Sequence, residues 1–277
     1  MTRTAVAFGP ALVVAGTARL RSAVLVRPNP GIERTGARIG EPRAIYARAL
    51  EQHEVLRSTL EYFGVKTIVL ASHASDPYEV SAGDAAVVFA DGALMMRPSA
   101  MSRRAEADRM QAEFAVLDVP LAGHIASPGL LDGSDVILAG ETAFVGVGSR
   151  GNKPGRAGFA KLAAARGYRV VEVQLAPDVL SLRSVAGAVA KDTIVLGADK
   201  ADAAAFSDFR TIVLERGEEL AAGVLCLSER HVLAEIRYRT ALAKMRRAGI
   251  TVESIDLYEF TKLGIAPSML ALALKRE

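Results

Sequence analysis

Apolar positions follow a helical period in several stretches of the chain, and each of these stretches ends in a β-rich run. Residues 49–71 show the pattern first: a helical segment reaches Gly64 and is followed by the apolar run 65–71. Glycine just past a helix end favours the left-handed conformation that closes the helix. Related segments are residues 104–126, residues 155–176 with Gly167, a shortened copy at residues 202–217, and residues 238–257 with Gly249. The chain therefore predicts a helix–strand unit repeated roughly every 40–50 residues.

Short β segments lie between these units and resemble hairpins. They are residues 84–97, 135–148, 192–199 and 223–236. Asp91-Gly92 is a turn signal inside the first of them. A conventional parallel α/β sheet is the alternative, but parallel crossovers need no hairpins. The pattern favours mixed modules arranged around a common centre.

Composition excludes some functional classes. The 277 residues are 51% hydrophobic and 23% charged, as in a soluble globular protein, and Lys+Arg 34 against Asp+Glu 31 gives a net charge of +3. The charge is spread along the chain, and aromatic residues make up 5% with no Trp, so neither a basic footprint nor a base-stacking platform is present. We expect no nucleic-acid partner.

The single cysteine, Cys226, excludes an intrachain disulfide and lies in an apolar, strand-like run typical of a buried structural residue. The N-terminal stretch lacks the order of a signal peptide, and no membrane-spanning run is present. We therefore expect a cytoplasmic protein. No Cys/His cluster has the spacing of metal ligands, so no metal or cofactor is predicted, and His53 belongs to an amphipathic helix.

Three stretches carry a family resemblance. They are residues 47–70, residues 84–110 with the pattern RP-x-A-x-SRR-x-E, and residues 131–155 with the pattern LDG-x-DV…G…FVG…SR-x-N. Together they resemble the dimethylarginine dimethylaminohydrolase branch of the guanidine-modifying, or pentein, superfamily, from about residue 22 to the C-terminus. The resemblance implies an α/β fold, a five-bladed propeller of pseudo-repeated ββαβ modules. It also implies a single domain over residues 1–277, with residues 1–20 as an N-terminal extension.

The resemblance also implies a chemistry for the family. A Cys thiolate attacks the guanidinium carbon of an arginine derivative, a His acts as general acid/base, acidic residues hold the guanidinium, and arginines bind the substrate carboxylate. Four positions look retained. Asp84 matches a guanidinium-binding aspartate, Arg103 and Arg150 match the carboxylate-binding arginines, and Asp132 matches the acid that orients the His.

Other family positions are replaced. The run D-x-x-F-x-E-D is here YEVSAGD, which puts Tyr78, Ser81 and Gly83 at its Asp, Phe and Glu. The segment LHLKS is here LSLRS, with Ser181 in place of the His, and GLTC is here APSM, with Met269 in place of the Cys. None of His53, His73, His124 and His231 falls at the catalytic position. A thioether has no proton to lose, so the family's hydrolysis, deimination and amidino transfer are not expected.

Two hypotheses of different class follow. The first, which the pattern favours, is a repurposed enzyme that binds an acidic amino-acid-like molecule through Arg103 and Arg150. Its chemistry would be a non-covalent elimination, intramolecular displacement or small-ring cyclisation such as aziridine formation, with Asp84 and Asp132 as candidate acid/base residues. The second is a pseudoenzyme that serves as a ligand-binding or regulatory subunit of a complex or as a homo-oligomer. Leu257, Tyr258 and Phe260 could then form an interface, although core packing is their commoner use.

The state of the pocket separates the two hypotheses. An open pocket lined by both arginines and a carboxylate favours the enzyme. A pocket filled by Met269 and its neighbours counts against it.

Overall fold

The computed structural model describes residues 8–9, 11–38, 40–72 and 76–277. His73 and part of the predicted N-terminal extension, residues 1–7 and 10, lie outside these ranges. Within the ranges the strands form five separate sheets of three strands each. In every sheet the middle strand pairs antiparallel with the first strand and parallel with the third. The sheets are mixed, so a single parallel sheet is excluded.

Each sheet belongs to one module in which a hairpin is followed by a helix or turn and then by the third strand. The first module contains β15 (Ala271–Arg276), β1 (Leu20–Val26), α1 (Tyr46–Tyr62) and β2 (Lys66–Leu70), and the second contains β3 (Ala86–Phe89), β4 (Gly92–Met95), α2 (Arg104–Val116) and β5 (Leu121–His124). The third contains β6 (Val136–Ala139), β7 (Thr142–Val147), α3 (Lys153–Ala164) and β8 (Arg169–Gln174), and the fourth contains β9 (Ala186–Ala190), β10 (Thr193–Gly197), η6 (Ala203–Phe206) and β11 (Arg210–Leu214). The fifth contains β12 (Leu225–Ser228), β13 (His231–Glu235), α5 (Arg239–Arg247) and β14 (Thr251–Ile255). These modules agree with the predicted ββαβ repeat, and their closure into a propeller stays a prediction. The shortened copy at residues 202–217 has only the 3-10 turn η6 in place of a helix.

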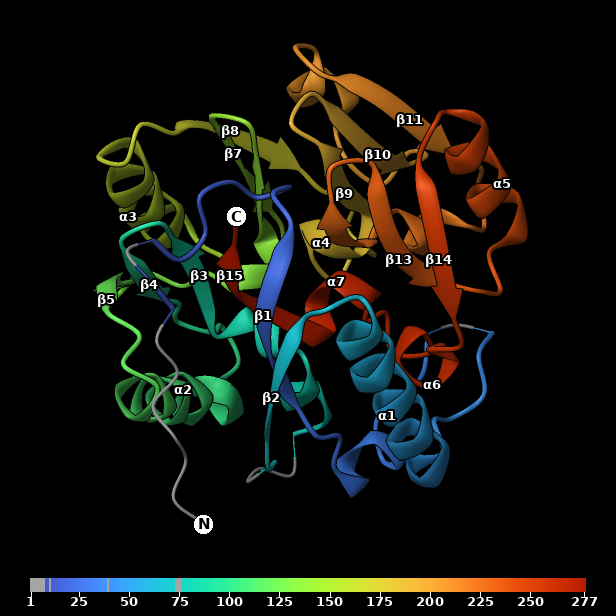
Figure 1. Cartoon of the computed structure of the whole chain (residues 1–277), viewed down its shortest axis with the longest axis horizontal. Coiled ribbons are helices and arrows are strands. Elements are labelled where there is room, and N and C mark those ends of the chain that lie inside the picture. The colour runs from blue at the N-terminus through green and yellow to red at the C-terminus, as the bar shows by residue number, and fades with distance from the viewer. Residues whose placement is uncertain (1–7, 10, 39, 73–75) are drawn as a thin grey trace.

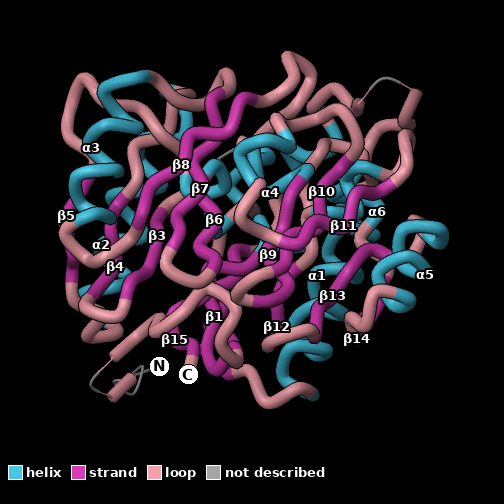
Figure 2. Tube along the Cα trace, turned by 90° about the horizontal axis from the view of Figure 1, so that it is seen from above, coloured by secondary structure: helices cyan, strands magenta, loops and turns pink. Residues whose placement is uncertain are grey.

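The helices lie at the periphery and the first strands lie inside. In Figure 1, α1, α2, α3 and α5 occupy the outside, whereas α4 (Leu182–Val185), α7 (Pro267–Leu270) and β15 lie near the middle. Figure 2 shows the same arrangement from above, with helices at both flanks of the strands. The first module joins the two ends of the chain, because β15 pairs with β1.

A short helical turn precedes the first strand of every module. The five turns are η3 (Ala82–Asp84), η5 (Gly133–Asp135), α4, η7 (Glu219–Ala222) and α7. Contacts link η3 to η5, η5 to α4, α4 to η7 and to α7, and α7 to η3. Glycine permits this close packing: a Cβ at Gly133 would lie 2.2 Å from the carbonyl oxygen of Gly83, and one at Gly223 would lie 2.3 Å from the Cβ of Ala266. These five turns therefore lie together at the middle of the molecule.

The remaining short elements are turns within modules or between them. They are η1 (Pro30–Glu33), η2 (Pro77–Val80), η4 (Met101–Arg103) and α6 (Tyr258–Thr261). No helix in the described ranges combines the length and the apolar character needed to cross a membrane. The predicted turn at Asp91-Gly92 is displaced by one residue: Ala90 and Asp91 form it, and Gly92 opens β4 opposite Phe89. Gly92 has φ 155° and would place a Cβ 2.7 Å from the Pro120 carbonyl oxygen, so a side chain is excluded there for packing reasons.

A substitution at Leu25 tests the packing of β1 against β15, the last strand of the chain. Leu25 is fully buried in β1, between Ala271 of β15 and Val69 of β2. Leu25→Ala should lower the free energy of unfolding by about 2–5 kcal/mol, because it leaves a cavity in a packed core. Urea unfolding measures this loss. Val14→Ala, at a side chain 51% exposed, is the control and should change stability by less than about 0.5 kcal/mol. Equal effects of the two substitutions would contradict the packing described here.

Candidate functional site

Arg103 is a buried arginine bound on every side by acceptors of the protein. It ends η4 and precedes α2, so Glu106 three residues later lies on the same face of the helix. Arg103 Nε lies 3.0 Å and Nη2 lies 2.7 Å from the Glu106 carboxylate, Nη1 lies 2.7 Å from Asp84 Oδ2, and Nη2 donates to the Tyr78 carbonyl oxygen at 2.9 Å. The side chain is only 2% exposed.

Arg150 completes a cluster with Asp84 and Asp132. Asp84 ends η3, Asp132 immediately precedes η5, and Arg150 lies in the loop between β7 and α3. Arg150 Nη1 lies 3.1 Å from Asp84 Oδ2 and 3.2 Å from Asp132 Oδ2. The backbone N–H of Ser99 donates to Asp132 Oδ1 at 3.2 Å. The structure thus brings together all four residues that the sequence analysis selected as retained.

The charged groups of these four residues, however, form ion pairs with one another. Both guanidinium groups are bound by protein carboxylates, and the carboxylates of Asp84 and Asp132 are almost fully buried. Arg150, 12% exposed, is the arginine of this cluster with access to solvent. Roles for Arg103 and Arg150 in substrate binding, and for Asp84 and Asp132 in acid–base chemistry, therefore stay predictions. The participation of Glu106 was missed, although its i,i+3 spacing from Arg103 was visible in the sequence.

The two aspartates differ in protonation. Burial and the negative charge of Asp84 raise the pKa of Asp132 to about 6, against the opposing effect of the two arginines. Burial also acts to raise the pKa of Asp84, but the positive charges of Arg103 and Arg150 outweigh it and hold the value below normal. Asp84 is therefore the permanent counter-ion, and Asp132 exchanges its proton near neutral pH.

Ser181 and Met269 are in contact and fully buried. Ser181 precedes α4 and Met269 lies in α7, two of the central turns. The Ser181 hydroxyl lies 3.6 Å from Met269 Sδ, and the backbone N–H of Ala266 lies 3.4 Å from the same sulfur. Met269 also packs in the hydrophobic cluster that includes Leu270 and Phe260. The thioether thus fills its position completely.

Tyr78, Ser81 and Gly83, which the resemblance counts as replaced, have different surroundings. The Tyr78 ring lies under Arg150, with 5.1 Å between the guanidinium carbon and the ring centroid. Ser81 is buried, and its hydroxyl has no hydrogen-bond partner among the described residues. A Cβ at Gly83 would lie 2.8 Å from Arg183 Nη1 and 3.2 Å from the Met269 carbonyl oxygen. Gly83 therefore makes room for Arg183.

A cleft of about 590 Å³ opens beside Tyr78. Its charged lining residues are Arg38 and Lys200, which are basic, and Asp178 and Glu219, which are acidic. Lys200 Nζ and Asp178 Oδ2 form an ion pair of 2.5 Å. Ser149, next to Arg150 in sequence, also lines this cleft, which we call the outer cleft. The residues of the outer cleft come from distant loops without a shared motif, so no sequence pattern predicted this cleft.

The structure therefore shows part of each outcome that would separate the enzyme from the pseudoenzyme. The Met269 side chain is fully buried in the hydrophobic cluster, which by that criterion counts against the enzyme. An open cleft nevertheless lies next to the arginine cluster.

Within the described part of the chain, His53, His124, His231 and Cys226 add no competing site. His53 is buried in α1, and burial lowers its pKa to about 4. His231 Nε2 lies 3.0 Å from Glu253 Oε1, and His124 is exposed on β5. Cys226 is buried in β12, where burial raises its pKa to about 11, as expected for a structural cysteine. Within the described residues, no three His, Cys, Asp or Glu side chains are grouped so as to hold a metal ion.

The structure also decides the use of the three apolar residues considered for an interface. Leu257 and Phe260 are buried in the core. Tyr258 is half-buried, its hydroxyl lies 2.5 Å from Glu41 Oε2, and Arg237 lies over its ring. Core packing is therefore the role of Leu257 and Phe260.

Asp135 is a functional candidate that the sequence analysis missed. It lies three residues after Asp132, in the same LDGSD motif, and is fully buried. Its Oδ1 accepts the backbone N–H of Leu182 at 2.9 Å, next to Ser181, and its Oδ2 has no partner among the described residues. Burial raises the pKa of Asp135 to about 8, so its carboxyl group is mainly protonated at pH 7.

Removing Arg103 should be costly. Arg103→Met leaves Asp84 and Glu106 buried without their main counter-ion, and we expect the free energy of unfolding to fall by about 3–5 kcal/mol. Chemical denaturation measures it. The control Arg216→Met removes an arginine 82% exposed and should cost less than about 1 kcal/mol. An Arg103→Met protein as stable as the wild type would contradict a structural role for the cluster.

Asp135 should make stability depend on pH. Its folded-state pKa lies above its value in the unfolded chain, so the unfolded state loses its proton first and stability falls as pH rises from about 4 to about 8. Asp135→Asn does not titrate, so the variant should gain on the wild type over this range, by up to about 5 kcal/mol. Thermal unfolding at pH 5 and pH 8.5 measures the gain. The exposed control Asp108→Asn should follow the wild type, and a parallel course of Asp135→Asn would exclude the assignment.

Comparison with known proteins relates this geometry to a family. No family model matches the sequence. The chain is 31% identical over 263 residues to the N(G),N(G)-dimethylarginine dimethylaminohydrolase of Streptomyces coelicolor, which covers 92% of this chain and 97% of the relative. It is 25% identical over 238 residues to the enzyme of the same name from Pseudomonas aeruginosa.

Solved structures share the fold. The Pseudomonas aeruginosa enzyme, as a cysteine-to-serine mutant complexed with citrulline, superposes with a TM-score of 0.84 at 22% identity and covers 92% of this chain and 99% of its own. An amidinotransferase of the saxitoxin biosynthetic pathway from Microseira wollei superposes with a TM-score of 0.76 at 14% identity and covers 97% of this chain and 98% of its own. The chain therefore belongs to the dimethylarginine dimethylaminohydrolase family, within the amidinotransferase, or pentein, fold.

Proposed function

We propose that this chain is a repurposed member of its family that has lost the catalytic Cys and His, with Met269 and Ser181 at their positions. The observation that carries the proposal is the buried contact of 3.6 Å between the Ser181 hydroxyl and Met269 Sδ. A thioether cannot become a thiolate and a hydroxyl cannot replace an imidazole as a base near pH 7, so covalent attack on a guanidinium carbon lacks both of its agents. We also infer that the five modules are the blades of a propeller with this contact near its centre.

The ligand in this proposal is a carboxylate-bearing amino-acid derivative in the outer cleft. The cleft carries basic groups, Arg38 and Lys200, and acidic groups, Asp178 and Glu219, and so complements both charges of such a molecule. Arg38 joins Arg150 as a candidate for the carboxylate. Arg103, saturated by protein acceptors, serves in this proposal to hold Asp84 and Glu106 in place.

The chemistry proposed is non-covalent: an elimination, an intramolecular displacement or the closure of a small ring such as an aziridine in specialised metabolism. In a ring closure the substrate amine nitrogen attacks a carbon of the same molecule, and the bond from that carbon to its leaving group breaks. The Asp132 carboxylate accepts the amine proton, for which a pKa of about 6 is well suited at neutral pH. Arg150 stabilises the departing anion, exchanging a protein carboxylate for it.

A pseudoenzyme is the second candidate. Met269 fills its position, and both arginines are neutralised by protein carboxylates, as in a structure kept for binding rather than reaction. In that case the outer cleft holds a regulatory ligand, or the chain supports a partner subunit or a second copy.

Activity and binding measurements test the proposal. The wild type should release no citrulline from N(G),N(G)-dimethylarginine, whereas a panel of acidic amino-acid derivatives should contain ligands that raise its melting temperature. Arg150→Ala and Arg38→Ala should each weaken the best ligand at least about tenfold, since each removes a charged partner. Arg169→Ala, at an exposed arginine of β8, is the control.

Three outcomes are decisive. Citrulline formation by the wild type would overturn the proposal. Ligand binding without turnover would favour the pseudoenzyme. Equal binding by wild type, Arg150→Ala and Arg38→Ala would place the ligand outside the cleft.

A further inference from the structure

A second cavity lies at the middle of the molecule, apart from the outer cleft. Its lining includes residues from the first strand of every module: Ala86 to Val88 of β3, Val136 to Leu138 of β6, Ala186 to Ala188 of β9, Leu225 and Cys226 of β12, and Leu272, Ala273 and Arg276 of β15. Val13 and Gly16 of the N-terminal segment also contribute. The cavity measures about 110 Å³, enough for several waters or one tetrahedral oxyanion. We call it the central pocket.

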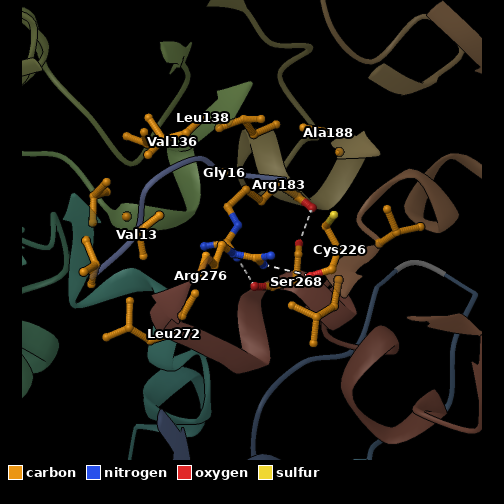
Figure 3. Close-up of a pocket in the computed structure, with 18 of the residues that line it drawn as sticks. Val13, Gly16, Val136, Leu138, Arg183, Ala188, Cys226, Ser268, Leu272 and Arg276 are labelled. Atoms are coloured by element: carbon orange, nitrogen blue, oxygen red, sulfur yellow. Dashed lines mark hydrogen bonds between the residues drawn. The ribbon is translucent and has the colours of Figure 1, made fainter. Parts of the chain in front are cut away.

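Two arginines occupy this otherwise apolar space. Arg276, only 6% exposed, donates from Nη1 to the Ala18 carbonyl oxygen and from Nη2 to the Cys226 carbonyl oxygen, both at 2.8 Å. Arg183, partly buried, donates from Nη2 to the Ser268 carbonyl oxygen. Figure 3 shows both side chains reaching into the same pocket from α4 and β15.

Neither arginine has an acidic partner. No carboxylate of the described residues lies within ion-pair distance, 4.0 Å, of Arg183 or Arg276, and the groups that accept their hydrogen bonds are backbone carbonyl oxygens, which carry no net charge. The Asp84 carboxylate influences Arg183 but is ion-paired to Arg103 and Arg150. One buried and one partly buried positive charge that repel each other are unfavourable unless a negative charge joins them.

We propose that the central pocket is a binding site for a small tetrahedral oxyanion, phosphate or sulfate, held between Arg183 and Arg276. Guanidinium groups bind such anions through paired N–H donors, and an enclosed apolar wall strengthens the attraction. The glycine at position 83 supports this arrangement, because any side chain there would collide with the Arg183 guanidinium.

The site is separate from the proposed chemistry but adjacent to it. Arg183 lies two residues after Ser181, and Ser268 immediately precedes Met269. The Ser268 hydroxyl donates to the Arg183 carbonyl oxygen at 3.1 Å, so α4 and α7 are tied together at the pocket. An anion bound here would stabilise the two turns that carry Ser181 and Met269, whether or not a reaction takes place in the outer cleft.

Titration of the full-length protein with inorganic phosphate tests the proposal. At constant ionic strength maintained with sodium chloride, millimolar phosphate or sulfate should raise the melting temperature, and calorimetry should give the affinity. Arg183→Gln and Arg276→Gln should each weaken binding at least about tenfold, Arg183→Lys should retain part of it, and the exposed control Arg216→Gln should leave it unchanged.

Cys226 supplies a readout at the pocket itself. It is the single cysteine of the chain and lines the pocket, so bound phosphate should slow its modification by methyl methanethiosulfonate several-fold relative to chloride. This measurement uses the wild type and remains available if a variant does not fold. Absence of phosphate and sulfate binding, equal binding by wild type and both glutamine variants, or an unchanged rate at Cys226 would overturn the site. Acetate binding as tight as phosphate would overturn the tetrahedral class.

Discussion

The structure depends on the neutralisation of Arg103 inside the protein. A buried guanidinium is tolerated only when carboxylates surround it, and Asp84 and Glu106 meet this condition from η3 and α2. Arg150 and Asp132 extend the cluster to the next module, so the positions of η3 and η5 are fixed relative to each other by charge as well as by packing. Losing one member leaves the others buried and unpaired, so the protein's stability alone requires these residues.

This pairing changes how the cluster of Asp84, Arg103, Asp132 and Arg150 is interpreted. The family resemblance assigns Asp84, Arg103, Asp132 and Arg150 to a substrate site, but a network that closes on itself needs the same residues for stability. Arg150 is the partly exposed arginine of the cluster, and Asp132, almost fully buried beside it, is the member whose pKa is about 6. The Ser181–Met269 contact is buried and packed as a core contact.

The two cavities differ in charge and therefore in the ligands they fit. The outer cleft carries groups of both signs and suits a zwitterionic molecule. The central pocket carries only Arg183 and Arg276 and suits an anion. The short turn α4 lines both spaces, since Arg183 belongs to the central pocket and Ser184 and Val185 to the outer cleft, and Ser268 of α7 lines the central pocket. Ligands in the two places would therefore act on the same short elements.

The sequence by itself determined the local elements. Helical periodicity ended by Gly64, Gly167 and Gly249 predicted α1, α3 and α5, and these glycines have φ values of 79°, 84° and 86°. The family resemblance also selected Asp84, Arg103, Asp132 and Arg150 for one site, with the arginines at the carboxylate end of a substrate and Asp84 at its guanidinium end; their direct pairing was not predicted. Tertiary structure alone decided that β15 pairs with β1. It also decided that protein carboxylates neutralise Arg103 and Arg150, and that Arg183 and Arg276 line the same pocket. Local patterns are set by neighbours along the chain, whereas these contacts join residues far apart in sequence and depend on how the modules pack.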